Sequence, residues 1–204
     1  MEVTITILND KDKINEIVDI HMQSFSGFFL TFLGKGFLKQ LYKGFLEEKN
    51  SNLIVASDLD GKILGFLAYS SNLSGFYKYL IKKYLISFGW YAMLGFFRNP
   101  KIFFRLIRAF TYSQEAKREE KYIELSSIGV LPIKENSGIG SKLINYLKEL
   151  DFKEYQYIKL ETDAKNNEKA NNFYINNHFK LYKNYLTPEK REMNEYRYYL
   201  KEQK

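Results

Sequence analysis

The pattern of hydrophobic and polar positions predicts strands and helices that follow one another along the whole chain. Runs of β-branched and other apolar residues are typical of strands, whereas apolar residues three or four positions apart are typical of one helix face. On this basis the expected strands are residues 3–8, 53–57, 63–69, 122–131, 157–162, 179–185 and 195–200. The expected helices are residues 34–48, 138–150 and 167–176, preceded by one that starts after the cap residues Asn9 and Asp10.

Two of these strands are expected to form a hairpin. Residues 53–57 and 63–69 are separated by five residues that end in Asp60-Gly61-Lys62. An Asp-Gly pair supplies the positive φ of a tight turn, so the two strands should pair in an antiparallel manner.

The segment 73–119 differs from the rest of the chain because it is both aromatic and basic. Its pattern predicts two or three helices interrupted at Gly89, Gly95 and Pro100, and we interpret it as a helical insertion. The stretch 61–114 contains no Asp or Glu and carries a charge of +8, so the remainder of this +7 chain carries −1. Such a stretch suits contact with nucleic acid, an anionic membrane surface or an anionic substrate, but a solvated helical face over an aromatic core also explains it.

Length and composition favour a single globular domain over residues 1–204. The chain contains no cysteine, which excludes disulfides, cysteine-ligated metal sites and a cysteine nucleophile.

The N-terminus carries Glu2, Asp10 and Asp12 with no apolar stretch behind a basic start, so we expect no secretory signal. The longest uncharged apolar run, residues 84–97, is shorter than the roughly 20 residues of a bilayer span. We therefore expect a cytoplasmic protein.

One stretch of the chain indicates an anion-binding site. A strand ends at Pro132, a polar turn follows, and Gly138 and Gly140 open an amphipathic helix. Glycines allow close backbone approach, and the amides and dipole of a helix N-terminus attract a pyrophosphate. The third glycine of a dinucleotide fingerprint is missing, and Gly34-Lys35-Gly36 lacks the spacing of a Walker loop.

At these residues the sequence resembles the GNAT superfamily of acyl-CoA-dependent N-acetyltransferases. Val130 and Pro132, with Gly138-x-Gly140 six residues beyond the proline, are similar to the pyrophosphate motif of that family. The second signature of the family is matched by Asn167, Ala170, Phe173, Tyr174, His178 and Phe179. The resemblance covers about residues 1–72 and 120–200 and leaves the insertion outside.

The resemblance implies an α/β (α+β) fold with a mixed, mostly antiparallel twisted sheet of about seven strands flanked by helices, and the helical insertion before the cofactor-binding strand. It implies that this strand splays from the strand at 157–162, and that acetyl-CoA lies in the gap as the acyl donor, without a metal. A backbone amide near residues 128–130 would then polarise the thioester carbonyl. The implied cofactor-binding residues are Ile128, Gly129, Val130, Lys134, Asn136, Ser137, Gly138, Ile139, Gly140, Ser141 and Asn167.

Two side chains match catalytic positions of the family. Tyr174 corresponds to the tyrosine that donates a proton to the leaving sulfur, with packing of a helix as the alternative role. Glu124 corresponds to the glutamate that acts as a base, with a paired strand carboxylate as the alternative, and Glu161 and Asp163 are the fallbacks. Asn167 suits either a hydrogen bond to the pantetheine arm or a helix cap.

Three further positions carry a carboxylate or an imidazole side chain. The Gln or Arg that the family usually carries three residues before the first glycine is Glu135 here, and Lys134 or Lys142 is the substitute cation. His178 replaces a glycine, so we expect it in a turn with a left-handed conformation. His21 lies on the apolar face of the first helix, where we expect a hydrogen-bonded core residue.

The acceptor is expected to be a small-molecule amine that binds beside residues 24–34 and 73–119. Because the second of these segments is basic, we expect an anionic acceptor, such as an amino sugar or a nucleotide-sugar, or one presented at an anionic membrane. The alternative is a non-catalytic basic module that binds nucleic acid or a membrane on an acyltransferase-like scaffold. Nucleic acid fits the apolar insertion poorly, and a homodimer is compatible with the sequence.

Overall fold

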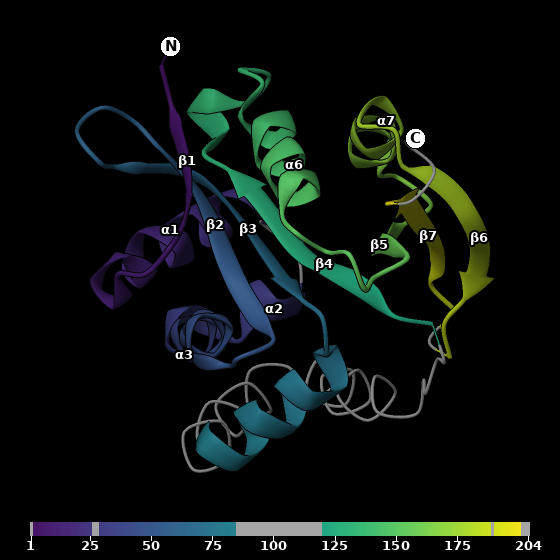
Figure 1. Cartoon of the computed structure of the whole chain (residues 1–204), viewed down its shortest axis with the longest axis horizontal. Coiled ribbons are helices and arrows are strands. Elements are labelled where there is room, and N and C mark those ends of the chain that lie inside the picture. The colour runs from purple at the N-terminus through teal and green to yellow at the C-terminus, as the bar shows by residue number, and fades with distance from the viewer. Residues whose placement is uncertain (1, 26–28, 85–119, 189, 201–204) are drawn as a thin grey trace.

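One sheet organises the protein, and its strands are antiparallel except for one central pair. The computed structural model describes residues 2–25, 29–84, 120–188 and 190–200. The 7-stranded sheet has the order β1-β2-β3-β4-β5-β7-β6, and only β4 and β5 run parallel (Figure 1). The strands are β1 (Thr4–Ile7), β2 (Ser51–Ser57), β3 (Ile63–Ser70), β4 (Tyr122–Val130), β5 (Tyr157–Asp163), β6 (Lys180–Leu186) and β7 (Glu192–Tyr199).

Helices cover both faces of the first half of the sheet, and one further helix lies beside its second half (Figure 1). They are α1 (Ile14–Ser24), α2 (Phe29–Phe32), α3 (Gly34–Glu47), α6 (Ile139–Glu149) and α7 (Glu168–Asn176). Leu53 and Val55 of β2 pack in one core with α1 and α3, whereas Ile54 and Ala56 pack in a second core with α6. Alternate residues of a strand point to opposite faces, so this strand is apolar on both sides. Figure 1 shows α6 on the opposite side of the sheet from α1 and α3.

The first part of the expected insertion is a helix, residues 73–84. Its first turn is capped by Asn72, whose Oδ1 accepts the Gly75 amide at 2.9 Å. It packs closely against α3 at Gly44, where an added Cβ would lie 2.2 Å from the Leu80 side chain. The predicted interruptions at Gly89, Gly95 and Pro100 lie outside the described residues, as does most of the basic charge of this segment.

The expected fold class is confirmed, with small differences at element ends. β7 begins at Glu192 rather than at residue 195, because Glu192, Met193 and Asn194 extend its pairing with β5 and β6. The first helix is preceded by a short 3-10 turn, Lys11–Lys13, which Asp10 caps through a 2.8 Å bond to the Asp12 amide. Among the described residues, no helix is both long and apolar enough to cross a membrane.

Candidate active site

The site lies where β4 and β5 separate. The two strands pair over three residues only, from Tyr122 opposite Tyr157 to Glu124 opposite Lys159. Beyond Glu124 a bulge in β4 leaves Ser126 as an extra residue between Leu125 and Ser127, which face successive residues of β3. A bulge bends a strand and increases its twist. The expected splay of the two strands is therefore present.

The gap between the strands forms part of a cleft of about 2050 Å³. The described elements bring every candidate site residue to the lining of this one cleft. They are Glu124, Ile128, Gly129, Val130, Lys134, Asn136, Ser137, Gly138, Ile139, Gly140, Ser141, Asn167 and Tyr174.

The polar turn before α6 presents backbone amides to the cleft. The Lys142 amide donates to the Gly138 carbonyl at 3.0 Å, which is the first intrahelical bond of α6. The amides of Ile139, Gly140 and Ser141 precede that ladder, and no side chain caps them in the described part of the chain. Amides of this kind, at the positive end of a helix dipole, suit an anion.

The two glycines of this turn have different physical roles. Gly138 has a φ of +79°, a left-handed conformation that residues with a Cβ rarely adopt, and an added Cβ would meet nothing within 4 Å. At Gly140 the limit is space, since a Cβ would lie 3.0 Å from the Phe173 ring of α7. The pair therefore shapes the turn and also seats α7 against α6.

The charged side chains around the turn include an ion-pair partner for Glu135. This carboxylate forms an ion pair with Lys169 of α7, so the acid at a position expected to meet phosphate is neutralised by a cation. Lys134 is half-buried and lines the cleft. Lys142 is exposed and does not line it, so Lys134 and Lys169 are the better placed cations.

The free edge of β4 supplies further amides. The Leu131 amide donates to the Leu64 carbonyl of β3 at 2.9 Å. Because successive residues of a strand direct their backbone groups to alternate sides, the amides of Ile128 and Val130 face the open side toward β5. The Val130 carbonyl accordingly accepts a 2.8 Å hydrogen bond from Ser24 at the end of α1, rather than from β3.

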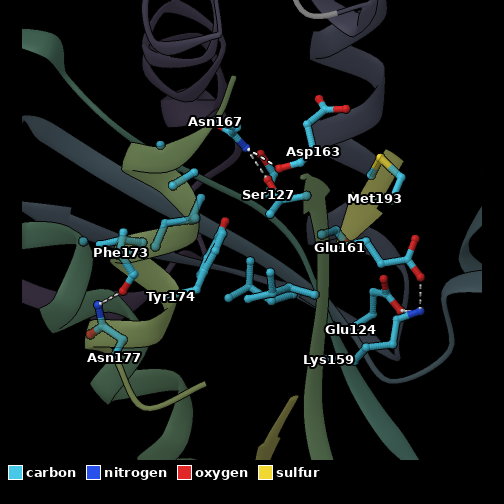
Figure 2. Close-up of a pocket in the computed structure, with 18 of the residues that line it drawn as sticks. Glu124, Ser127, Lys159, Glu161, Asp163, Asn167, Phe173, Tyr174, Asn177 and Met193 are labelled. Carbon is cyan, nitrogen blue, oxygen red and sulfur yellow. Dashed lines mark hydrogen bonds and ion pairs between the residues drawn. The ribbon is translucent and has the colours of Figure 1, made fainter. Parts of the chain in front are cut away.

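Tyr174 lies on the α7 side of the cleft (Figure 2). Its ring packs against Phe173, Phe179 and Tyr196, with ring centroids 5.4, 6.1 and 6.0 Å away. Burial raises the pKa of Tyr174 to about 12. Its hydroxyl makes no hydrogen bond to the described residues, so it keeps its proton at neutral pH and can donate it to a bound group.

A polar network fixes the connection between β5 and α7. Asn167 donates through Nδ2 to the Thr162 hydroxyl at 2.7 Å and to the Asp163 carbonyl at 3.3 Å. It occupies the cap position of α7 without a side-chain cap bond. Arg191 holds both carboxylate oxygens of Asp163, at 2.7 and 2.8 Å. This pairing makes Asp163 a structural carboxylate and a poor candidate for a base.

Glu124 and Glu161 lie on either side of one buried lysine. Lys159 Nζ is 3.1 Å from Glu124 Oε2 and 2.9 Å from Glu161 Oε1 (Figure 2). Burial raises the pKa of Glu124 to about 7, and the attraction of Lys159 limits this rise. Glu124 is thus both a paired strand carboxylate and a carboxylate that can exchange a proton near neutral pH.

The two histidines occupy the environments that their sequence positions predict. His178 has a φ of +62° and follows α7 in a left-handed conformation. His21 is buried in the core, and its Nδ1 lies 2.6 Å from the Tyr42 hydroxyl. Its Nε2 has no partner among the described residues, so the core position is confirmed and the hydrogen bonding is half complete. Burial lowers the pKa of His21 to about 4, so the ring is neutral.

The sequence reasoning missed three residues of the cleft. Lys159 was visible as a single charge inside the apolar run of residues 157–160, a pattern that indicates a buried charge with a partner. Lys169 had no such signal, because exposed lysines are common on helices. Tyr77, from the helix at 73–84, also lines the cleft, and only the tertiary fold brings it there.

Comparison with known proteins agrees with this geometry. The profile of the Acetyltransferase (GNAT) family matches residues 14–179. No sequence among curated proteins matches the chain.

Solved structures share the fold at low sequence identity. An N-acetyltransferase from Staphylococcus aureus Mu50 is 18% identical with a TM-score of 0.59, covering 98% of this chain and 100% of its own. The ribosomal-protein-S18-alanine N-acetyltransferase from Escherichia coli is 14% identical with a TM-score of 0.59, covering 98% and 94%. The spermidine/spermine N-acetyltransferase SpeG from Vibrio cholerae is 12% identical with a TM-score of 0.57, covering 98% and 95%.

Proposed function

The chain belongs to the GNAT acetyltransferase family, and we propose that it transfers an acetyl group from acetyl-CoA directly to a primary amine. The observation that carries this proposal is the cleft at the separation of β4 and β5, which has free backbone amides at one end and Glu124 at the other. Acetyl-CoA supplies an activated thioester carbonyl. The residues of the chain bind, orient and move protons.

The donor half of the cleft binds the diphosphate. The amides of Ile139, Gly140 and Ser141 donate hydrogen bonds to its oxygens at the start of α6, with Lys134 nearby. The amides of Ile128 and Val130 on the free edge of β4 face the thioester. They stabilise the charge that develops on its oxygen, as an oxyanion hole does.

Two side chains move protons at the reacting atoms. Glu124 accepts a proton from the acceptor's ammonium group, which frees the nitrogen lone pair for attack on the carbonyl. The Tyr174 hydroxyl donates a proton to the departing thiolate. The ring packing of Tyr174 holds this hydroxyl at the cleft, and its raised pKa keeps it protonated until the sulfur leaves.

The acceptor presents its amine to the wall that contains Glu124. An anionic substituent would extend toward the basic segment that starts at residue 73, where Lys82 is exposed and Lys83 pairs with Glu47 at 2.8 Å. A salt titration tests this part of the proposal. If kcat/KM stays constant between 50 and 500 mM salt, the acceptor is not held by exposed charges.

A panel of amines with a thiol-release readout tests the proposed function. The panel contains spermidine, a peptide with N-terminal alanine, glucosamine and glucosamine phosphate, so that cationic and anionic acceptors are compared. Acetyl-CoA at 100 times its Kd should also stabilise the fold by about 2.7 kcal/mol. The absence of thermal stabilisation by acetyl-CoA, together with stabilisation by DNA or anionic vesicles, would contradict the transferase and support the binding module.

A further inference from the structure

The most unusual feature of the cleft is a lysine buried between two carboxylates. Glu124 and Lys159 lie opposite each other in the last pair that joins β4 to β5, directly before the strands separate. The Lys159 side chain is 7% exposed and that of Glu124 is 10% exposed, whereas that of Glu161 is 31% exposed. The lysine therefore connects an inner carboxylate at the origin of the gap to an outer carboxylate that reaches solvent.

The charges in this group do not balance. Two ionised carboxylates and one ammonium leave a net charge of −1, which the neighbouring strands compensate, because Glu195 is paired with both Arg197 and Lys183. An acceptor that arrives as an ammonium ion is attracted by Glu124 and gives its proton to this carboxylate. Once the proton has moved to Glu124, the amine is neutral and the remaining Lys159–Glu161 pair is neutral as well.

Other titratable groups face this cluster from four elements. Tyr122 of β4 lies with its ring 5.3 Å from Lys159 Nζ, and the Tyr185 hydroxyl of β6 donates to Glu161 at 2.5 Å. Glu195 of β7 raises the pKa of Glu124, as Glu161 does. Tyr77, from the helix at 73–84, has its own pKa raised by burial and by the two carboxylates Glu124 and Glu161.

We infer that Glu124, Lys159 and Glu161 act as one triad, in which Lys159 is a positioning residue that holds Glu124 at the wall of the cleft and keeps it reactive, while Glu161 competes for the same ammonium group. This inference rests on the proposed function, in which Glu124 is the base.

The proton balance of the triad is simple. The acceptor ammonium gives one proton to Glu124, which becomes a neutral acid. The nitrogen loses a second proton as the amide forms, and this proton replaces the one that Tyr174 gave to the sulfur. Lys159 keeps its protons throughout. Glu124 then releases its proton to solvent through the cleft. One proton leaves per amide formed, as the conversion of an ammonium and a thioester to an amide and a thiol requires.

The test compares the pH profiles of two variants whose effects on Glu124 are opposite. In the parent, kcat/KM for the most active amine of the panel should fall as the pH drops below about 7, because Glu124 becomes protonated. Lys159→Met removes the attraction that favours the charged carboxylate, so this acid limb should move up by about one to three pH units. Glu161→Gln removes a repulsion and leaves Lys159 to Glu124 alone, so the limb should move down by about one unit.

A matched control and a binding measurement separate folding from mechanism. Lys153→Met also removes a lysine from an ion pair, but Lys153 and Asp151 are exposed and outside the cleft, so its profile should match that of the parent. The Kd for acetyl-CoA, measured by calorimetry, should be the same in all four proteins. This result would show that each variant is folded with an intact donor half.

The possible results distinguish a failure of the triad from a failure of Glu124 as the base. Limbs that move in opposite directions support the triad. If the parent shows its limb near pH 7 and the two variants leave it in place or move it in the same direction, the triad is wrong and the base assignment stands. A parent without any acid limb between pH 5 and 9 would overturn both the triad and the role of Glu124.

Discussion

The donor half and the acceptor half of the cleft present different chemical groups. At the start of α6 the cleft presents backbone amides, glycines and exposed polar side chains, and its charged residues lie at the margin. At the wall of β4 and β5 it presents carboxylates and a lysine that are largely buried. A site made of backbone depends on local conformation, whereas a site made of buried charges depends on how neighbouring strands pair.

Glu124→Gln should have the largest effect, because it removes the base from the acceptor half. We expect kcat/KM at pH 8 to fall by about 10²- to 10⁴-fold, with an unchanged Kd for acetyl-CoA. Below pH 7 the parent should lose about a factor of ten per pH unit, since the active form of Glu124 is the ionised one, whereas the variant should show no such limb. Initial rates of thiol release between pH 5 and 9 measure both quantities. A variant that retains the parental limb would show that another group is the base.

Tyr174→Phe should lower kcat by about 10²-fold while the Kd for acetyl-CoA stays within a factor of two. The ring packing with Phe173, Phe179 and Tyr196 is preserved, so only the proton donor is lost. Tyr182→Phe, on the exposed edge strand β6 and outside the cleft lining, is the matched control. Equal turnover of the parent and the Tyr174 variant would leave Tyr174 with a packing role alone.

Gly138→Val should weaken the donor half only. A β-branched residue at a φ of +79° is strained by about 1–3 kcal/mol, and relief of that strain moves the first amides of α6, so we expect acetyl-CoA affinity to drop by about 10- to 100-fold. Gly61→Val places the same strain at a φ of +76° in the distant β2–β3 hairpin. Calorimetric titration should show a loss of affinity for the first variant and parental affinity for the second. Similar losses in both would indicate general destabilisation instead.

Glu135→Gln should have the smallest effect and the opposite sign. It releases Lys169 from an exposed ion pair and removes a negative charge beside the turn, so acetyl-CoA should bind about two- to five-fold more tightly. The gain should shrink at 500 mM salt. Glu149→Gln, at the far end of α6, removes the same charge and should leave the affinity unchanged. Weaker binding by the Glu135 variant would mean that this carboxylate supports the turn itself.

The same contrast explains which features of the site could be predicted from the sequence. Gly138 and Gly140 specify a local turn, and His178 takes the left-handed conformation expected for a residue that replaces glycine. Lys159 was not assigned a role, because its two partners are set by strand pairing and by burial, neither of which is a local property. For the same reason the sequence could offer Asp163 as a base, whereas Arg191, 28 residues away along the chain, holds that carboxylate.

Most strands of the sheet were predictable because they contain a run of apolar or alternating residues, above all in β2 and β3. The start of β7 was missed because Glu192, Met193 and Asn194 do not form an apolar run, and their pairing partners lie on β5 and β6. The bulge at Ser126 was also beyond prediction, since it follows from the offset between β3 and β4 rather than from a glycine or a proline. It is nonetheless the irregularity that accompanies the separation of the two central strands.

The contact between Gly140 and Phe173 has a consequence for anyone who wishes to engineer this enzyme. Phe173 rests on the first turn of α6, and the next residue along the same helical turn is Tyr174. A larger side chain at position 140 would therefore push α7 aside and carry the phenol with it. A substitution at this contact would therefore change coenzyme binding and protonation of the departing sulfur together.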